Sequence, residues 1–515
     1  MILDDTPDRL GSLAEPAAAA LDELADRDAV ARTWAGDHTL WRDDPTEISD
    51  RLGWLPVVAD MGARVGDLAA QAAALAAPVD HVLLAGMGGS SLFPEVVARH
   101  APTAPGSPRL VVLDTTDPAA IARAGGELAP ERTLVVAASK SGSTVETRSH
   151  LAWAWERHPD PARFAVITDP GSGLADLAAE RGFAATFENP PDMGGRYSAL
   201  SLFGLVPALL AGADAAGLLA SAAAMADRLR AAAAGNPAAR LGATLAAGVR
   251  QGRDKLTLVV PDHVATFGLW LEQLLAESTG KDGTGIVPVV GEPLGPPEAY
   301  GDDRLFVALG GDTEAAALAA LADAGHPVAV VGGVDDFTDL GGQVLLWEMA
   351  TALAGALLGI QPFDQPDVES AKAATRGLLA GGTPDIEVTS LDELTGAVRP
   401  GDYVAIQAFV DPGSPVVPAI ERARVALRDR LGVATTVGLG PRFLHSTGQL
   451  HKGGPDSVLC VQVVGDDPED VAIPDAGYGF SMLKHAQADG DLLTLTERKR
   501  RAGRVRLDDL AEVGA

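Results

Sequence analysis

The sequence predicts an α/β protein with two doubly wound parallel-sheet domains, followed by a smaller C-terminal α/β segment. Short apolar runs recur along the chain and alternate with helical stretches. These runs are continuously apolar, as expected for parallel strands that helices cover on both faces. The length of 515 residues fits several domains, because it exceeds what one ordinary hydrophobic core supports.

The first 60 residues are expected to form a polar, helical lead-in, with Trp34, Trp41 and Trp54 fixing it to the body of the protein. A first doubly wound domain is predicted for residues 61–210. Its strand candidates are five apolar runs at 81–86, 109–114, 133–139, 163–168 and 184–188.

A second domain of the same class is predicted for residues 240–380, after an Ala-rich helical linker. Its strand candidates are 255–260, 285–290, 304–310 and 326–332. Between them the sequence predicts helices near 264–278, 313–324 and 341–358. The two domains repeat an architecture without a strong residue-level repeat.

A third segment is predicted for residues 385–515, after a cluster of Gly, Pro and Asp near 381–385 that is typical of a linker. It carries a charged helix and three further strand candidates. The helix is expected at 416–430, and the strands at 403–410, 433–439 and 457–464.

Composition and charge restrict the possible functions. The formal charge of −30 argues against a general nucleic-acid or membrane-surface binder. The Ala-rich run 212–249 is interrupted by Asp and Arg, so no membrane span is expected there. The single cysteine, Cys460, excludes an internal disulfide framework and a multi-cysteine metal site. The acidic N-terminus does not resemble a secretory signal, and the cytoplasm is the expected compartment.

Two loops at predicted strand ends are candidates for ligand binding. The loop 86–95 is rich in glycine and opens a helix, which suits an anion but is also a common structural turn. The loop 139–147 contains a dense group of hydroxyl side chains that could hold a phosphate. A simpler alternative is a helix cap, with Ser141 or Ser143 as N-cap and Glu146 completing a capping box. One serine would suffice for a cap, so the surplus favours phosphate binding.

Three further segments carry polar groups. Arg196 follows two glycines in 188–201, and the simpler interpretation of this arginine is a surface salt bridge. Glu272, Gln273 and Glu277 lie on an otherwise apolar helix, where a solvated helix face is the usual explanation. In the segment 361–372, Lys372 follows Gln365 by two helical turns.

These five segments, in this order and spacing, resemble the sugar-isomerase double domain of glucose-6-phosphate isomerases over about residues 80–375. With 39–55 and 440–455 included, the chain looks closer still to the isomerase half of bifunctional transaldolase–isomerase fusions. The resemblance implies a metal-free and cofactor-free aldose–ketose isomerase. Such an enzyme would interconvert glucose 6-phosphate and fructose 6-phosphate through a cis-enediol, as a homodimer.

The resemblance also implies roles for individual residues. Glu277 would be the base that moves a proton between C1 and C2, and Arg196 would stabilise the enediolate. The residues that would bind the sugar phosphate are Gly89 and Ser90 at the sugar, Ser139, Ser141 and Thr144 at the 6-phosphate, Gln273 beside the base, and Gln365 with Lys372 near the ring oxygen.

The ring-opening histidine does not follow the family pattern. The family places it soon after the base glutamate, but no histidine lies between His263 and His326, and His326 is out of register. His445 and His451 are the better candidates, and one of them is expected to reach an active site, with a dimer interface as one route. Lys372 acting with water is the remaining alternative.

Three rival functions fit these motifs less well. A dual phosphoglucose/phosphomannose isomerase would tend to carry threonine where Gln365 stands. A non-catalytic sugar-phosphate sensor would not need both Glu277 and Arg196. A nucleotide-dependent dehydrogenase would need the full dinucleotide-binding spacing, which the loop 86–95 lacks.

Overall fold

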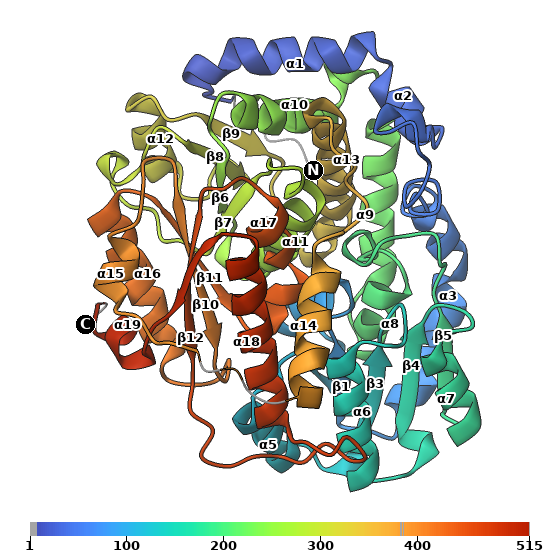
Figure 1. Ribbon diagram of the computed structural model, residues 1–515. Coiled ribbons are helices and arrows are strands. Elements are labelled where there is room, and N and C mark those ends of the chain that lie inside the picture. Colours follow the sequence, from blue (N-terminus) through green and yellow to red (C-terminus); the bar gives the residue numbers. More distant parts are fainter. Residues whose placement is uncertain (1–7, 382–383, 385, 514–515) are drawn as a thin grey trace.

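The computed structural model describes residues 8–381, 384 and 386–513, without the side chains of residues 368–372. The strands form three sheets, and helices pack around and between them (Figure 1). All three sheets are parallel, and they share the same order over their first four strands. The strands of each sheet lie within one of the three predicted ranges, while the domain boundaries stay predictions.

The first sheet has the strand order β2-β1-β3-β4-β5. Its strands are β1 (His81–Gly86), β2 (Arg109–Leu113), β3 (Thr133–Ala138), β4 (Phe164–Thr168) and β5 (Ala185–Glu188). Each agrees with the predicted run to within one residue. The central strands are buried along almost their whole length, as cover on both faces requires. The helices around them are α3 (Val57–Ala76), α4 (Leu92–His100), α5 (Pro118–Glu127), α6 (Val145–Arg157), α7 (Gly173–Arg181) and α8 (Leu202–Leu210).

The second sheet has the order β7-β6-β8-β9. Its strands are β6 (Lys255–Val259), β7 (Val287–Val290), β8 (Arg304–Leu309) and β9 (Val328–Val331). Its helices are α9 (Ala215–Arg228), α10 (Pro237–Arg250), α11 (Phe267–Thr279), α12 (Ala315–Asp323) and α13 (Leu340–Leu358). Among the described residues, one segment, Phe337–Leu358, is long and apolar enough to cross a membrane, and its apolar 18-residue window is wholly buried. It contains α13, which packs on α9 and α10 as a core helix.

The C-terminal unit has the order β11-β10-β12-β13. Its strands are β10 (Tyr403–Phe409), β11 (Ala434–Leu439), β12 (Val458–Val464) and β13 (Arg501–Arg504). Its helices are α15 (Leu391–Thr395), α16 (Val417–Leu431), α17 (Gly448–Gly453), α18 (Phe480–Glu497) and α19 (Leu507–Val513), with α14 (Val368–Gly381) packed along α18. The sequence prediction contains neither β13 nor α18, because both are rich in polar residues and lack a clear apolar period.

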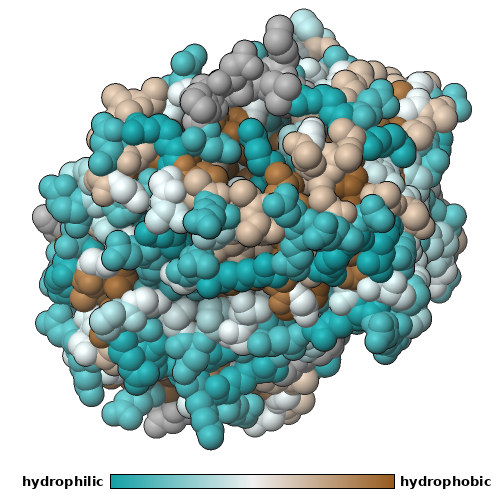
Figure 2. Space-filling view, turned by 90° about the horizontal axis from the view of Figure 1, so that it is seen from above, coloured by the Kyte–Doolittle hydropathy of each residue, from teal (hydrophilic) through white to brown (hydrophobic). Residues whose placement is uncertain are grey.

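The lead-in is helical and fixed by tryptophan, as expected from the sequence. It carries α1 (Ala14–Asp26) and α2 (Ala29–Trp34). The indole nitrogen of Trp34 donates to the carbonyl of Leu229 at 2.9 Å, and that of Trp41 donates to the carbonyl of Ala352 at 2.8 Å. Trp54 is fully buried. Figure 2 shows one face of the molecule, where hydrophilic residues cover most of the surface and apolar residues form small separate patches.

Candidate active site

The hydroxyl-rich loop connects the end of β3 to the start of α6. The hydroxyls of Ser139 and Thr144 lie 2.9 Å apart, and those of Ser141 and Ser143 lie 2.8 Å apart. The N-cap of α6 is Thr144, whose side chain makes no capping hydrogen bond. The interpretation of this loop as a serine cap with a capping box is therefore wrong. Ser141, Ser143 and Thr144 instead border a cavity, where their hydroxyls are available to an anion.

The glycine-rich loop after β1 forms a single 3-10 turn, Gly88–Ser90, and is held tightly by its neighbours. A Cβ on Gly89 would lie 1.9 Å from the carbonyl oxygen of Gly195. Gly88 has a φ of +54°, and a Cβ there would lie 2.8 Å from the side-chain nitrogen of Gln273 and 2.9 Å from the carbonyl oxygen of His445. Ser90 is buried at the same turn. Glycine at these two positions thus allows Gly195, Gln273 and His445 to approach the turn closely.

Arg196 is not part of a surface salt bridge, since its side chain is only 1% exposed. Its Nε donates to the Ser278 hydroxyl at 2.8 Å, and its Nη1 donates to Oε1 of Gln365 at 2.7 Å. Its Nη2 donates to the carbonyls of Pro362 and Asp364. These bonds fix the plane of the guanidinium and bring Gln365 from the second domain to the first.

Glu277 lies near the end of α11, buried rather than on a solvated face. Its Oε2 accepts a hydrogen bond from Gln273 at 3.1 Å and lies 3.7 Å from Nη1 of Arg196. Gln273 also donates to the carbonyl of His445 at 2.9 Å. Glu272 on the same helix is buried beside the Ser446 hydroxyl, and burial raises its pKa to about 7. Of the two carboxylates on α11, Glu277 is the one that faces the arginine.

His445 reaches this group from the C-terminal unit of the same chain. It ends the 3-10 turn Arg442–His445, and its Nε2 lies 2.9 Å from Oε1 of Glu146. Burial raises the pKa of Glu146, but His445, a backbone hydrogen bond and His150 together lower it more, so the net pKa lies below its ordinary value. An ionised carboxylate can only accept, so Nε2 carries the hydrogen and Nδ1 is the nitrogen left for acid–base chemistry.

Glu146 is the site residue that the sequence interpretation missed. In the sequence, Glu146 enters only through the alternative capping-box interpretation, because it follows Ser143 by three residues. The signal that could have found it is its position in the hydroxyl-rich loop that the resemblance already marks as part of the site. Its partner stands 299 residues further along the chain.

The other candidate residues do not join this group, or their side chains lie outside the part of the chain that the structure describes. His451 is buried in α17, where its Nδ1 meets the side-chain nitrogen of Gln407 at 3.2 Å. Burial and the nearby Lys452 lower its pKa to about 3, so it stays neutral at ordinary pH. His326 packs against the rings of Tyr300 and Phe306. Lys372 belongs to α14, but its side chain lies outside the described residues.

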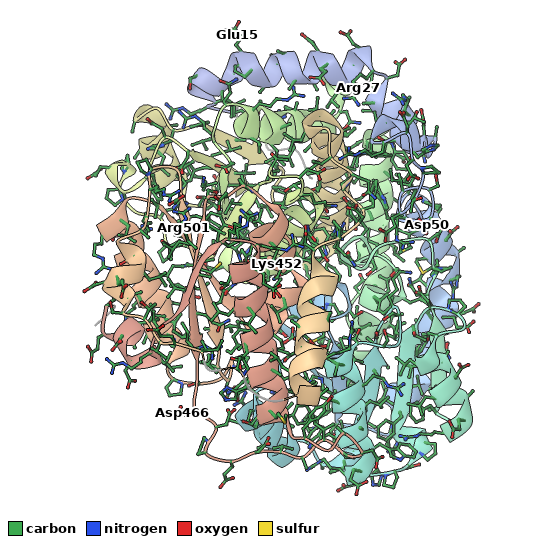
Figure 3. The ribbon with its side chains drawn as sticks, in the orientation of Figure 1. Glu15, Arg27, Asp50, Lys452, Asp466 and Arg501 are labelled. Atoms are coloured by element: carbon green, nitrogen blue, oxygen red, sulfur yellow. The ribbon has the colours of Figure 1, made fainter. Side chains whose placement is uncertain are left out.

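Two cavities border this group of residues. One, of about 430 Å³, is lined by Ser141, Ser143, Thr144 and His445 together with residues of α14 and α18. The other, of about 670 Å³, is lined by Lys281, Gln361 and Asp364 among others. Lys452 lines both cavities and lies at the centre of the view in Figure 3. Lys452 therefore connects a cavity at the hydroxyl loop with a cavity at the segment 361–367.

Lys281 is a further buried group that the sequence interpretation did not single out. Its ammonium bonds the carbonyl of Asp364 at 2.8 Å and the carboxylate of the same residue. It thereby holds the segment whose carbonyls bind Arg196. In the described part of the chain, no group of three or more His, Cys, Asp or Glu residues could hold a metal ion.

Comparisons with known proteins identify the family and the fold of the chain. A family model described as phosphoglucose isomerase matches residues 61–289. A glucose-6-phosphate isomerase of Rubrobacter xylanophilus is 34% identical over 348 residues, which cover 56% of this chain and 80% of the relative. A solved structure of a hypothetical protein from Thermus thermophilus has a TM-score of 0.62 and 27% identity, and the match covers 73% of this chain and 100% of that one.

A solved glucose-6-phosphate isomerase from Chlamydia trachomatis shares the fold. Its TM-score is 0.56 at 19% identity, and the match covers 71% of this chain and 86% of that one. The range matched by the family model contains the hydroxyl loop, Arg196 and Glu277, whereas Gln365 and His445 lie beyond it.

Proposed function

The chain belongs to the phosphoglucose isomerase family and interconverts glucose 6-phosphate and fructose 6-phosphate, and we propose that it does so through a cis-enediol with Glu277 as the base. The observation that carries this assignment is the pair of Glu277 and Arg196. A buried carboxylate lies 3.7 Å from a guanidinium that hydrogen bonds from all three of its nitrogens hold in place.

Glu277 takes the proton from C2 of the open-chain aldose and returns it to C1, while a proton passes from the C2 hydroxyl to the oxygen at C1, which converts the aldose into the ketose. Negative charge develops on the oxygens at C1 and C2 in the enediolate. Arg196 is already oriented by Gln365, Ser278 and the carbonyls of Pro362 and Asp364. A fixed cation at this place stabilises that charge without reorganisation.

His445 opens the sugar ring before this step. Its Nδ1 gives a proton to the ring oxygen as the bond from C1 to that oxygen breaks, and the imidazole then takes the proton that the C1 hydroxyl loses. Glu146 stabilises the imidazolium form of His445. The support for this role is the 2.9 Å contact between His445 Nε2 and Glu146, together with the place of His445 on the cavity that the hydroxyl loop borders.

The hydroxyl loop holds the 6-phosphate through Ser139, Ser141 and Thr144. The turn at Gly88–Ser90 lies against the sugar, with Gln273 and Gln365 around it and Lys372 near the ring oxygen. The support for the phosphate site is that the Thr144 side chain makes no capping bond to α6 and that the loop opens on a cavity of about 430 Å³.

A homodimer in the cytoplasm is proposed as well. The cytoplasm is proposed from the N-terminal sequence and the single cysteine, and the dimer from the resemblance alone. His445 reaches the site within one chain, so completing the site does not require a second copy. Sedimentation at the concentration of the activity assay tests the dimer. A monomer with full activity would overturn it.

The main test is a coupled assay that compares the two possible aldose substrates. We expect conversion of fructose 6-phosphate to glucose 6-phosphate and little conversion to mannose 6-phosphate. The variant Gln365→Thr tests which residue sets this preference, because Gln365 orients Arg196 next to the reacting carbons. Equal activity towards both aldoses in the unchanged enzyme would favour a dual isomerase.

A further inference from the structure

The carboxylate of Glu146 receives a second hydrogen bond that the mechanism above does not use. Gln487 lies on α18 of the C-terminal unit and is buried. Its side-chain nitrogen donates to Oε1 of Glu146 at 2.7 Å. This is the same oxygen that lies 2.9 Å from Nε2 of His445. One carboxylate oxygen therefore connects two side chains of the C-terminal unit.

The orientation of the Gln487 amide is fixed by a third residue. The hydroxyl of Thr116, which is fully buried, donates to Oε1 of Gln487 at 2.7 Å. An ionised carboxylate cannot donate, so the amide nitrogen must face Glu146 and the amide oxygen must face Thr116. Thr116, Gln487, Glu146 and His445 thus form a hydrogen-bond network in this order. Thr116 and Glu146 belong to the first domain, and Gln487 and His445 belong to the C-terminal unit.

The surrounding packing holds the residues of this hydrogen-bond network in place. Phe480 and Leu483 of α18 share an apolar cluster with Leu151 of α6 and other residues of the first domain. The ring of Phe480 stacks on that of His150, one turn after Glu146 on the same helix. Because apolar contacts join α18 to α6, the Gln487 amide cannot drift away from the carboxylate without disturbing a buried interface.

We propose that Gln487 is a positioning residue of the isomerase reaction, which holds the Glu146 carboxylate in place for His445. The C-terminal unit then has a function in the reaction beyond supplying the histidine. It also sets how strongly that histidine is held by its carboxylate partner. The proposal rests on the role given above to His445.

The physical reason is the sharing of one oxygen between two donors. A hydrogen bond from Gln487 stabilises the ionised carboxylate and reduces its pull on the imidazolium. The imidazolium of a ring-opening acid that is held less strongly by its carboxylate partner gives up its proton to the ring oxygen more readily. Other titratable or charged groups around this pair are Asp114, Arg148, His150, Arg376, Lys452 and Tyr478.

The test compares Gln487→Glu, Gln487→Leu and Thr116→Val with the unchanged enzyme, through the pH profile of kcat/KM for closed-ring glucose 6-phosphate. Gln487→Glu adds a negative charge beside the pair and favours the protonated imidazole, so the alkaline limb should move up by about one pH unit. Gln487→Leu should lower closed-ring turnover about tenfold, a part of what an acid–base group contributes. Thr116→Val should also lower closed-ring turnover, by a smaller factor than Gln487→Leu.

A matched control is Thr494→Val, which removes another buried hydroxyl from α18, bonded to the carbonyl of Gly490. It should lower the melting temperature without moving the pH profile. Folded Gln487 variants that keep the alkaline limb and the closed-ring turnover of the unchanged enzyme would overturn the proposal. A loss of turnover that only follows the loss of folded protein would overturn it as well.

His445→Gln, measured in parallel, separates this proposal from the function on which it rests. If His445→Gln keeps full closed-ring turnover, the ring-opening role fails. The NMR titration of the His445 ring then still tests Gln487 directly, because the ring should titrate at higher pH in Gln487→Glu. An unchanged titration in that variant would contradict the positioning role whatever His445 does.

Discussion

The first sheet and the sheet of the C-terminal unit have the same order over four strands, β2-β1-β3-β4 and β11-β10-β12-β13. In both, the order reverses between the first and third strands along the chain, where open α/β sheets bind their ligands. In the first domain the loops at this place are the Gly88–Ser90 turn and the hydroxyl loop 139–144, and they border the candidate site.

The corresponding strand ends of the C-terminal unit carry acidic residues that form ion pairs with Arg and Lys side chains instead. Asp411, after β10, pairs with Arg123 of the first domain. Asp467, after β12, pairs with the buried Lys484, which also lies 2.9 Å from Asp117 of the first domain. Under the proposed function, the same position in the same fold binds substrate in one unit and forms ion pairs with basic side chains in the other. The residues of the loops decide which, because the fold alone does not specify a function.

The largest effect on turnover is expected at the proposed catalytic base. Glu277→Gln should lower turnover by roughly 10²–10⁴-fold, because a positioned base is removed while the amide fills the same space. KM should change little. Steady-state kinetics with fructose 6-phosphate measures both. Glu272→Gln is the matched control on the same helix, and its turnover should stay near normal. A near-normal rate for Glu277→Gln would rule out Glu277 as the base.

The next effect tests what the C-terminal unit contributes to the chemistry. His445→Gln should lower turnover of the closed-ring substrate by about 10²-fold, the lower end for loss of an acid–base group. Proton exchange at C1 of an open-chain analogue should be spared, because that step uses Glu277. His451→Ala and His326→Ala should keep normal turnover per folded molecule. Equal loss on both substrates would place His445 in the proton transfer rather than in ring opening.

A smaller effect tests the hydroxyl loop. Ser141→Ala combined with Thr144→Ala should raise KM about tenfold or more, because a hydrogen bond to a charged group contributes about 1.5–3 kcal/mol. The melting temperature should hold, since the Thr144 side chain caps no amide. Ser172→Ala is the matched control, because Ser172 does cap α7. It should cost about 0.5–2 kcal/mol of stability at constant KM. The opposite pattern would restore the capping interpretation.

The smallest effect concerns docking. Asp411→Asn removes the ion pair with Arg123, whose side chain is 43% exposed, and should cost at most about 1 kcal/mol of unfolding free energy. Burial raises the pKa of Asp411, but Arg123 and the Gly413 amide lower it more, so the net pKa falls below 3.8. The stabilisation is therefore complete above the unfolded-state pKa and is lost as pH falls through the lower folded-state value.

Urea unfolding of the two proteins at neutral and acid pH measures this difference. It should be present at neutral pH and should shrink in acid and in high salt. The control is Glu127→Gln, which removes a longer pair with Arg109 inside the first domain, where both side chains are more than half exposed. Its effect should be smaller still. A difference that persists in acid would assign the stabilisation to something other than the ion pair.

The positions of most strands, the class of fold and the motifs of the site could be predicted from the sequence, because these features depend on local properties. A continuously apolar run marks a covered parallel strand wherever it occurs, and a glycine or hydroxyl cluster at its end marks a ligand loop. For this reason the strands of the first sheet agree with prediction to within one residue. The helix α18 could not be predicted, because many of its polar residues are buried against other elements.

Only the tertiary structure decided which side chains act together. Glu146 has the local pattern of a capping residue, and its partner His445 stands in another unit. His445 and His451 are equally plausible by sequence, yet one faces the site while the other is held neutral inside the C-terminal unit. Arg196 has the pattern of a surface residue and is buried against the segment that carries Gln365. Local sequence sets the backbone, whereas burial and hydrogen-bond partners depend on how distant segments pack, and these determine what each side chain can do.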